Sequence, residues 1–179
     1  MNLLAPYLTL EAVRLDVEAA SRKRLFEEAS LAVESAYGEP HDEIFSALMA
    51  RERLGSTGVG FGCAIPHGRV AELAAPAVVF VRSQAPLPYD APDGLPVQLF
   101  MTILVPEEHP ENHLALLRET ALLFQNESMR SALLSAPDEA AVCTLIANWI
   151  PPSDDDGTSS EVPEDSRNGD DASDKPLAS

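Results

Sequence analysis

The chain has 179 residues, of which 45% are hydrophobic and 23% charged, and its formal net charge is −17. This size fits one globular domain of ordinary dimensions with an extension. The negative charge argues against DNA or RNA binding, which needs a basic surface. No apolar run is long enough to cross a bilayer, and the N-terminus lacks the basic start and cleavage site of a signal peptide. We therefore expect a soluble, cytoplasmic protein without direct membrane insertion.

Helical and strand patterns alternate along the first 150 residues, which predicts a mixed α/β fold. A short strand is expected first, then a helix capped by Ser21 and stopped by Gly38, then a helix with Arg51 in its last turn. Two β-branched runs of strand length indicate central strands buried on both faces. Pro110 suits the first turn of a later helix. The expected strands are 12–17, 77–82 and 97–105, and the expected helices are 21–37, 41–54, 110–124, 128–134 and 138–149.

The last segment, residues 151–179, differs sharply from the rest in composition. It holds nine carboxylates against Arg167 and Lys175, and Pro, Ser, Gly and Asp dominate it. Such a segment has almost nothing to bury and cannot offset the entropy of ordering. We expect one domain over residues 1–150 and a disordered acidic tail over 151–179. The tail is a solubilising extension in the simplest interpretation, and screening of a basic partner is the alternative.

The segment from Arg51 to Arg69 reads RERLGSTGVGFGCAIPHGR and is the strongest candidate for a functional site. Its glycines allow close backbone approach to a ligand, and Pro66 and Gly68 hold His67 on what we expect to be a rigid turn. A neutral imidazole is nucleophilic near pH 7, so His67 could accept an acyl or phosphoryl group. The alternative is a tight turn with an incidental polar residue.

Each remaining candidate has a structural interpretation beside the functional one. Arg51 could bind phosphoryl oxygens, or it could simply favour a helix end. Ser56 and Thr57 could donate to a phosphoryl group, or they could be ordinary turn residues. Cys63 and Cys143 are far apart and give no disulfide framework, so both are expected to be small buried residues.

Three motifs in order resemble a known family. They are RERLGSTGVG with AIPHGR (51–60 and 64–69), PLPYDAPDG with PV (86–94 and 96–97), and LVP followed by HL (104–106 and 113–114). Together these motifs resemble enzyme IIA of the phosphoenolpyruvate:sugar phosphotransferase system, fructose/mannitol superfamily, and within it the nitrogen-regulatory branch. The resemblance covers about residues 10–150. It implies a single-domain sandwich in which helices flank a mixed β-sheet.

The resemblance also implies a phosphohistidine carrier. His67 would accept the phosphoryl group from a phosphocarrier resembling HPr or its nitrogen-branch counterpart NPr, with Arg51 supporting phosphate. His113 matches the family's second histidine, which stabilises the phosphoryl group; by itself it would be a solvated or capping residue. The family implies no cofactor, and His109 with Glu111 and His113 lacks the further ligands that a metal site needs. Neither a Walker motif nor G-x-G-x-x-G occurs, so the phosphoryl donor is expected to be another protein.

Several readings of the function remain open at this point. The nitrogen-branch motifs suggest a regulator of downstream target proteins. A sugar-specific IIA component that passes phosphate to a separate IIB is an alternative, as is a non-catalytic binding module of the same fold. A hydrolase with a Cys63–His67 pair would need an exposed, activated thiol. Ala115 stands where many nitrogen-branch relatives have a further histidine, which puts the details of partner choice in doubt.

Overall fold

The computed structural model describes residues 2–108 and 110–153. The predicted acidic tail falls outside the described residues from Asp154 onward, as does His109. The division of the chain at residue 150 and the disorder of the tail therefore stay predictions. Within the described residues, no helix combines the length and apolar character needed to cross a membrane.

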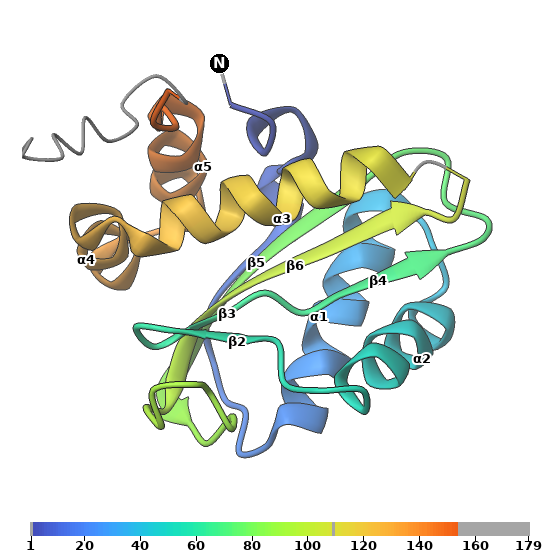
Figure 1. Ribbon diagram of the computed structural model, residues 1–179, viewed down its shortest axis with the longest axis horizontal. Coiled ribbons are helices and arrows are strands. Elements are labelled where there is room, and N and C mark those ends of the chain that lie inside the picture. Colours follow the sequence, from blue (N-terminus) through green and yellow to red (C-terminus); the bar gives the residue numbers. More distant parts are fainter. Residues whose placement is uncertain (1, 109, 154–179) are drawn as a thin grey trace, which may run out of the picture.

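The fold is organised by one mixed six-stranded sheet (Figure 1). The central strands β5 and β6 are antiparallel to each other, and β1 adds to β5 in parallel. On the far side of β6, both β3 and β4 pair with it in parallel, and β2 closes the edge antiparallel to β3. The strand bounds are β1 Val13–Val17, β2 Gly58–Gly60, β3 Cys63–Ala64, β4 His67–Val70, β5 Ala77–Leu87 and β6 Val97–Pro106.

Helices cover both faces of this sheet. In Figure 1, α3 lies across one face with α4 and α5 beside it, and α1 and α2 lie against the other face. Two short 3-10 helices, η1 (Ala5–Tyr7) and η2 (Leu10–Ala12), precede β1. The predicted sandwich of a mixed sheet between helices is thus confirmed. The helix bounds are α1 Arg22–Tyr37, α2 His41–Glu52, α3 Pro110–Gln125, α4 Glu127–Ser135 and α5 Glu139–Asn148.

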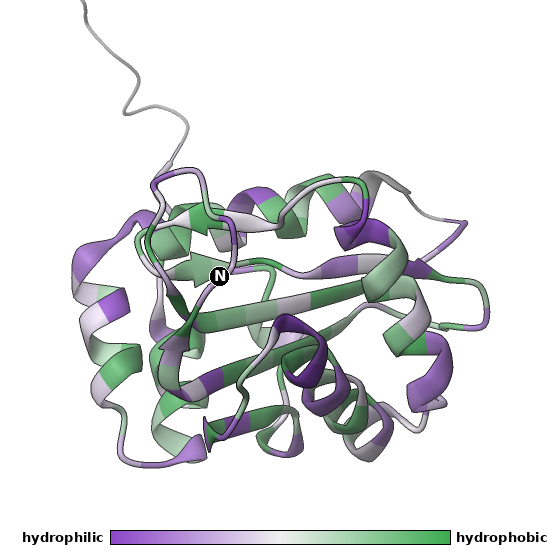
Figure 2. Cartoon of the chain, turned by 90° about the horizontal axis from the view of Figure 1, so that it is seen from below, coloured by the Kyte–Doolittle hydropathy of each residue, from purple (hydrophilic) through white to green (hydrophobic). Residues whose placement is uncertain are grey.

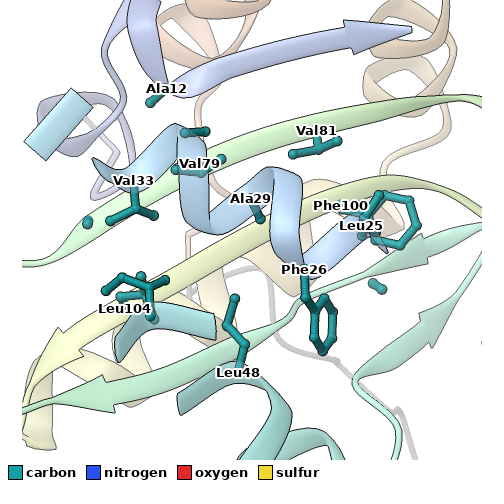
Figure 3. Close-up of a cluster of buried hydrophobic side chains, with 14 of the residues drawn as sticks. Ala12, Leu25, Phe26, Ala29, Val33, Leu48, Val79, Val81, Phe100 and Leu104 are labelled. Atoms are coloured by element: carbon teal, nitrogen blue, oxygen red, sulfur yellow. The ribbon is translucent and has the colours of Figure 1, made fainter. Parts of the chain in front are cut away.

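Two hydrophobic cores form because β5 and β6 are buried on both faces, as their uninterrupted apolar sequences predict. Figure 2 shows this as green central strands between helices that carry green and purple positions. On one face, Val79 and Phe100 pack against Phe26 of α1 and Leu48 of α2 (Figure 3). On the other face, residues such as Met101 pack against the apolar side of α3, α4 and α5.

Local signals set most element boundaries. Ser21 caps α1 by accepting a hydrogen bond from the backbone N–H of Arg24 at 3.2 Å, and Gly38 ends it with a φ of 79°. By contrast, α2 ends at Glu52, two residues before the predicted end. There the chain turns: the N–H of Leu54 bonds to the carbonyl of Arg51, and that of Gly55 to the carbonyl of Glu52, each at 3.1 Å. This turn redirects the chain from α2 into residues 55–69, which we call the glycine segment.

Candidate active site

His67 lies at the start of strand β4 and not in the turn that the Pro-His-Gly sequence predicts. It pairs with Ile103 of β6, and the carbonyl of the preceding Pro66 accepts the Ile103 N–H at 2.9 Å. Pairing with the buried strand β6 thus outweighs the local turn preference of Pro and Gly. Pro66 is tolerated because it occupies the break between β3 and β4, where its missing N–H costs nothing in the ladder.

The imidazole of His67 is fixed at both nitrogens. Its Nδ1 lies 2.8 Å from the carbonyl oxygen of Ile65, and its Nε2 lies 3.1 Å from Nε of Arg51. A carbonyl only accepts and a guanidinium only donates, so the proton is on Nδ1 and the lone pair is on Nε2. Burial lowers the pKa of His67 most, and the charge of Arg51 lowers it further, against an opposing effect of the Ile65 bond. The ring is therefore held neutral with Nε2 as its nucleophilic atom.

Arg51 reaches His67 from the last turn of α2, where the sequence predicts it. Its Nη1 donates to the carbonyl of Gly55 at 2.9 Å, which secures the guanidinium against the turn that follows the helix. Helix α2 packs against β4, and Gly68 makes the close approach possible: a Cβ there would lie 3.3 Å from backbone atoms of Ala47. The two elements thus place a permanent cation against the nucleophilic nitrogen.

His113 comes to the same place from the first turn of α3. Its ring centroid lies 5.2 Å from that of His67 at an interplanar angle of 59°. The residue is only 9% exposed, and its Nδ1 is buried without a hydrogen-bond partner among the described residues. Burial is the largest cause that lowers its pKa, followed by the charges of His67, Arg69 and Arg51. A buried polar atom without a partner is uncommon, so the placement of His113 beside His67 is costly for the fold.

Two hollows of about 430 and 390 Å³ open on either side of the Arg51–His67 pair. His113 and Arg69 line the first hollow, and the glycine segment and α3 line the second. No carboxylate among the described residues lines either hollow, in a protein with many more acidic than basic residues. The local charge is therefore positive and suited to an anion. Arg69, to which the sequence analysis gave no role, joins the site because alternation along β4 places it on the same face as His67.

Ser56 and Thr57 lie in the glycine segment, but their hydroxyl protons are already used. Ser56 Oγ donates to the carbonyl of Tyr89 at 2.9 Å and accepts from the N–H of Gly58 at 3.1 Å. Thr57 Oγ1 donates to a carboxylate oxygen of Glu52 at 2.6 Å and is 5% exposed as a residue. Direct donation from these hydroxyls to a phosphoryl group is therefore not the arrangement seen here. Their visible effect is to hold the shape of the loop.

The carboxylate of Glu52 is a buried part of the site that the sequence analysis missed. It adjoins Arg51 in the chain, accepts from Thr57 and pairs with Arg22 at 3.3 Å, and Arg22 in turn lies over the ring of Tyr89 at 4.5 Å. A glutamate near a helix end normally indicates a solvated residue. The only sequence signal was its position directly after Arg51, which did not distinguish it from other surface carboxylates.

The thiol interpretation does not fit the geometry. Cys63 is fully buried, and burial raises the pKa of its thiol to about 12. Its Sγ contacts the carbonyl oxygen of Phe61 at 3.6 Å, whereas both ring nitrogens of His67 are bonded to Ile65 and Arg51. A thiolate nucleophile activated by His67 is therefore excluded. Among the described residues, no group of three His, Cys, Asp or Glu side chains is placed to hold a metal ion.

Comparison with known proteins identifies the family. The sequence profile described as "Phosphoenolpyruvate-dependent sugar phosphotransferase system, EIIA 2" matches residues 6–149. The chain therefore belongs to the EIIA type 2 family of the phosphotransferase system, which confirms the resemblance found in the sequence.

The relatives include both regulatory and sugar-specific proteins. The chain is 38% identical over 135 residues to a "Nitrogen regulatory protein" of Pseudomonas aeruginosa, covering 75% of this chain and 88% of the relative. It is 34% identical over 142 residues to a "PTS system fructose-specific EIIA component" of Haloferax volcanii, covering 79% and 92%. The crystal structure of the nitrogen regulatory protein IIA-Ntr from Neisseria meningitidis superposes with a TM-score of 0.76 at 41% identity, covering 81% of this chain and 99% of that one.

Proposed function

We propose that this protein accepts a phosphoryl group on Nε2 of His67 from a phosphocarrier protein of the HPr or NPr type. The observation that carries this proposal is the fixed tautomer of His67: Nδ1–H is bonded to Ile65, and the Nε2 lone pair faces a cationic, carboxylate-free space. Membership of the phosphotransferase EIIA family supports the same reaction. Arg51, Arg69 and His113 surround the position that the phosphoryl oxygens would occupy.

The transfer requires no proton movement on His67. The Nε2 lone pair forms the new N–P bond while the N–P bond to the carrier histidine breaks and its electron pair returns to that ring. Nδ1 of His67 keeps its proton on the Ile65 carbonyl throughout. Because phosphoryl transfer proceeds through spreading negative charge on three oxygens, positioning and electrostatics provide most of the catalysis.

Arg51 and His113 have distinct roles in this scheme. Arg51 occupies Nε2 in the resting protein, so it must move from the nitrogen to the phosphoryl oxygens as the N–P bond forms. A guanidinium can bind two such oxygens at once. His113 lies close enough to donate to a third, and the phosphoryl charge would favour its protonated form. Neither role uses a metal ion or a cofactor.

The rim of the site suits a protein donor. Leu54 on one side of His67 is 83% exposed, and Leu114 on the other is 72% exposed. Exposed apolar side chains around a polar centre are typical of surfaces that bind other proteins. We infer that the carrier covers these leucines and presents its phosphohistidine between them. A cytoplasmic location follows from that partner.

After phosphorylation, we propose a regulatory outcome. The named nitrogen regulatory relatives favour a protein whose phosphorylation state alters its affinity for downstream targets. A doubly negative group at a previously cationic site is a sufficient electrostatic switch. The fructose-specific relative supports the second candidate, transfer of the phosphate onward to a separate IIB component.

The deciding experiment is phosphorylation in a mixture of phosphoenolpyruvate, enzyme I and a phosphocarrier protein, followed by intact mass. We expect wild type to gain one acid-labile phosphoryl group and His67→Ala to gain none. His41→Ala is the matched control, because His41 is a half-exposed histidine paired with Glu34, and it should be labelled like wild type. Absence of label on wild type with every cognate carrier would reject the proposal and favour a non-catalytic binding module. Adding a IIB protein distinguishes the two downstream outcomes.

A further inference from the structure

A continuous series of hydrogen bonds connects a buried carboxylate to the active histidine. The carboxylate of Glu52 accepts from the backbone N–H of Thr57 at 3.1 Å and from its hydroxyl at 2.6 Å. The carbonyl of Thr57 then accepts the N–H of Ile65 at 2.9 Å. Finally, the carbonyl of Ile65 accepts Nδ1–H of His67 at 2.8 Å. Each link shares a residue with the next, Thr57 and then Ile65, so the series is one connected unit.

Glu52 is rigidly placed within this unit. Its side chain is 4% exposed, and a carboxylate buried to that extent needs donors on both oxygens. Oε1 receives the Thr57 N–H and the Arg22 guanidinium, and Oε2 receives the Thr57 hydroxyl. Thr57 Oγ1 also lies 3.0 Å from the hydroxyl of Tyr89, which donates to it because the Thr57 proton goes to Glu52.

The position of Glu52 in the chain ties this unit to both catalytic side chains. It directly follows Arg51 at the end of α2, so anchoring its carboxylate also fixes the end of the helix that carries Arg51. Through Thr57, the same carboxylate holds the peptide of Ile65, whose carbonyl sets the tautomer of His67. Loss of the carboxylate would therefore change both the position of the Arg51 guanidinium and the orientation of the Ile65 carbonyl.

We propose that Glu52 is a positioning residue that keeps the proton of His67 on Nδ1 and holds Arg51 opposite Nε2. It does not touch the phosphoryl group and acts only through Thr57, Ile65 and the end of α2. The part of this inference that concerns transfer rates rests on the function proposed above. The part that concerns the tautomer is a property of the unphosphorylated protein and stands independently of it.

The test compares Glu52→Gln with a matched control at Glu119. Glu52 and Glu119 are each 7% exposed as residues. The carboxylate of Glu119 likewise accepts a backbone N–H, from Leu3 at 2.6 Å, but it lies outside the series that leads to His67. In Glu52→Gln, we expect the ¹⁵N signals of neutral His67 to show a reduced Nδ1–H population. The maximal transfer rate should fall about 10- to 100-fold, the range for small misplacements of reacting groups, with little change in KM for the carrier. Glu119→Gln should keep the tautomer and the rate.

A second variant guards against a folding defect in Glu52→Gln. Thr57→Val removes only the hydroxyl that Glu52 accepts and keeps the backbone bonds, so it should shift the tautomer and the rate in the same direction by a smaller amount. If folded Glu52→Gln and Thr57→Val both retain the wild-type ¹⁵N pattern, the inference is overturned. If wild type proves not to be a phosphoryl acceptor, the rate comparison fails with the proposed function, while the ¹⁵N comparison still decides whether Glu52 sets the tautomer.

Discussion

Arg51 and His67 are joined side chain to side chain, Nε to Nε2 at 3.1 Å, although one lies in the last turn of a helix and the other begins a strand. This contact has a consequence for the resting state. The nucleophilic lone pair is occupied by a cationic donor, so a protonated His67 would lose the bond and face the arginine charge. The contact therefore keeps His67 neutral. It also places the Arg51 guanidinium where it can bind the phosphoryl oxygens once the N–P bond forms.

Replacement of Arg51 by lysine tests whether the guanidinium itself is needed. Lysine keeps the charge but cannot bind two oxygens in a planar arrangement. Removing a preorganised hydrogen-bond donor that stabilises the transition-state charge slows a reaction by about 10²- to 10³-fold. We expect Arg51→Lys to slow phosphorylation by an amount at the low end of that range. The rate is measured by quenching the reaction at successive times and determining the phosphorylated fraction by intact-mass spectrometry. Arg53→Lys, at an exposed position two residues later that lines neither hollow, should keep the wild-type rate. Equal rates for both variants would mean that Arg51 contributes charge only.

Much of this fold could be predicted from the sequence, because its strongest signals are local. Ser21 and Gly38 mark the ends of α1, and the apolar runs of β5 and β6 have no alternative but burial between two layers. The glycine segment was harder. Its strands β2, β3 and β4 are two to four residues long. They depend on pairing with distant strands, β3 and β4 with β6 and β2 with β3, which no local pattern encodes.

The site shows the same division between local and long-range information. His67 was singled out by the glycines and the Pro-His-Gly sequence around it, and motif resemblance added the roles of Arg51 and His113; the structure brings all three together. The use of the Thr57 hydroxyl could not be predicted, since its acceptor is fixed by the turn after α2. Glu52 was missed for the same reason: its burial depends on Arg22 from a different helix, which lies 30 residues earlier in the chain.

The pH dependence of phosphorylation should follow the lowered pKa of His67. An unperturbed histidine titrates near ~6.5, and burial together with Arg51 moves the folded-state pKa of His67 below that value. The Nε2 lone pair is lost on protonation, so the acid limb of kcat/KM for the carrier, which reports ionisation of the free protein, should lie below about pH 6.5. The matching ¹H–¹⁵N titration of His67 should give the same midpoint. A midpoint at or above 6.5 would contradict the burial argument.

Lowered pKa values of His67 and His113 also imply a specific effect on stability. A histidine whose pKa is lower in the folded state stabilises the fold fully above its unfolded pKa, and that contribution is lost as the pH falls through the folded pKa. Urea unfolding should therefore show a falling free energy as the pH drops below about 6.5. The loss should be smaller in His113→Gln, which removes one of the two groups. An identical pH dependence in that variant would show that His113 does not contribute.

The apolar rim predicts a defect in carrier binding that is separate from chemistry. Leu114 is 72% exposed beside His67, so Leu114→Asp should leave the fold intact. The new carboxylate would have to be removed from water when the carrier binds, which costs binding energy. We expect KM for the phosphocarrier to rise about tenfold, the loss for removing one good apolar contact, with the maximal rate nearly unchanged. Leu134→Asp is the control, because Leu134 is 45% exposed near the C-terminal end of a different helix, α4, and lines neither hollow. A fall in maximal rate at constant KM would place Leu114 in the chemical step instead.

Gly68 links the packing of the fold directly to the catalytic pair. A Cβ at this position would lie 3.3 Å from the backbone carbon and oxygen of Ala47, so α2 would have to move away from β4 by a few tenths of an ångström. Overpacking of this kind costs about 1–3 kcal/mol, and urea unfolding of Gly68→Ala should show a loss in that range. Because α2 carries Arg51 and β4 carries His67, the same shift should lengthen the Nε–Nε2 contact and slow phosphorylation. A variant that lost stability but kept its full rate would show that the Arg51–His67 distance tolerates the movement, and that the tight packing at Gly68 serves the fold alone.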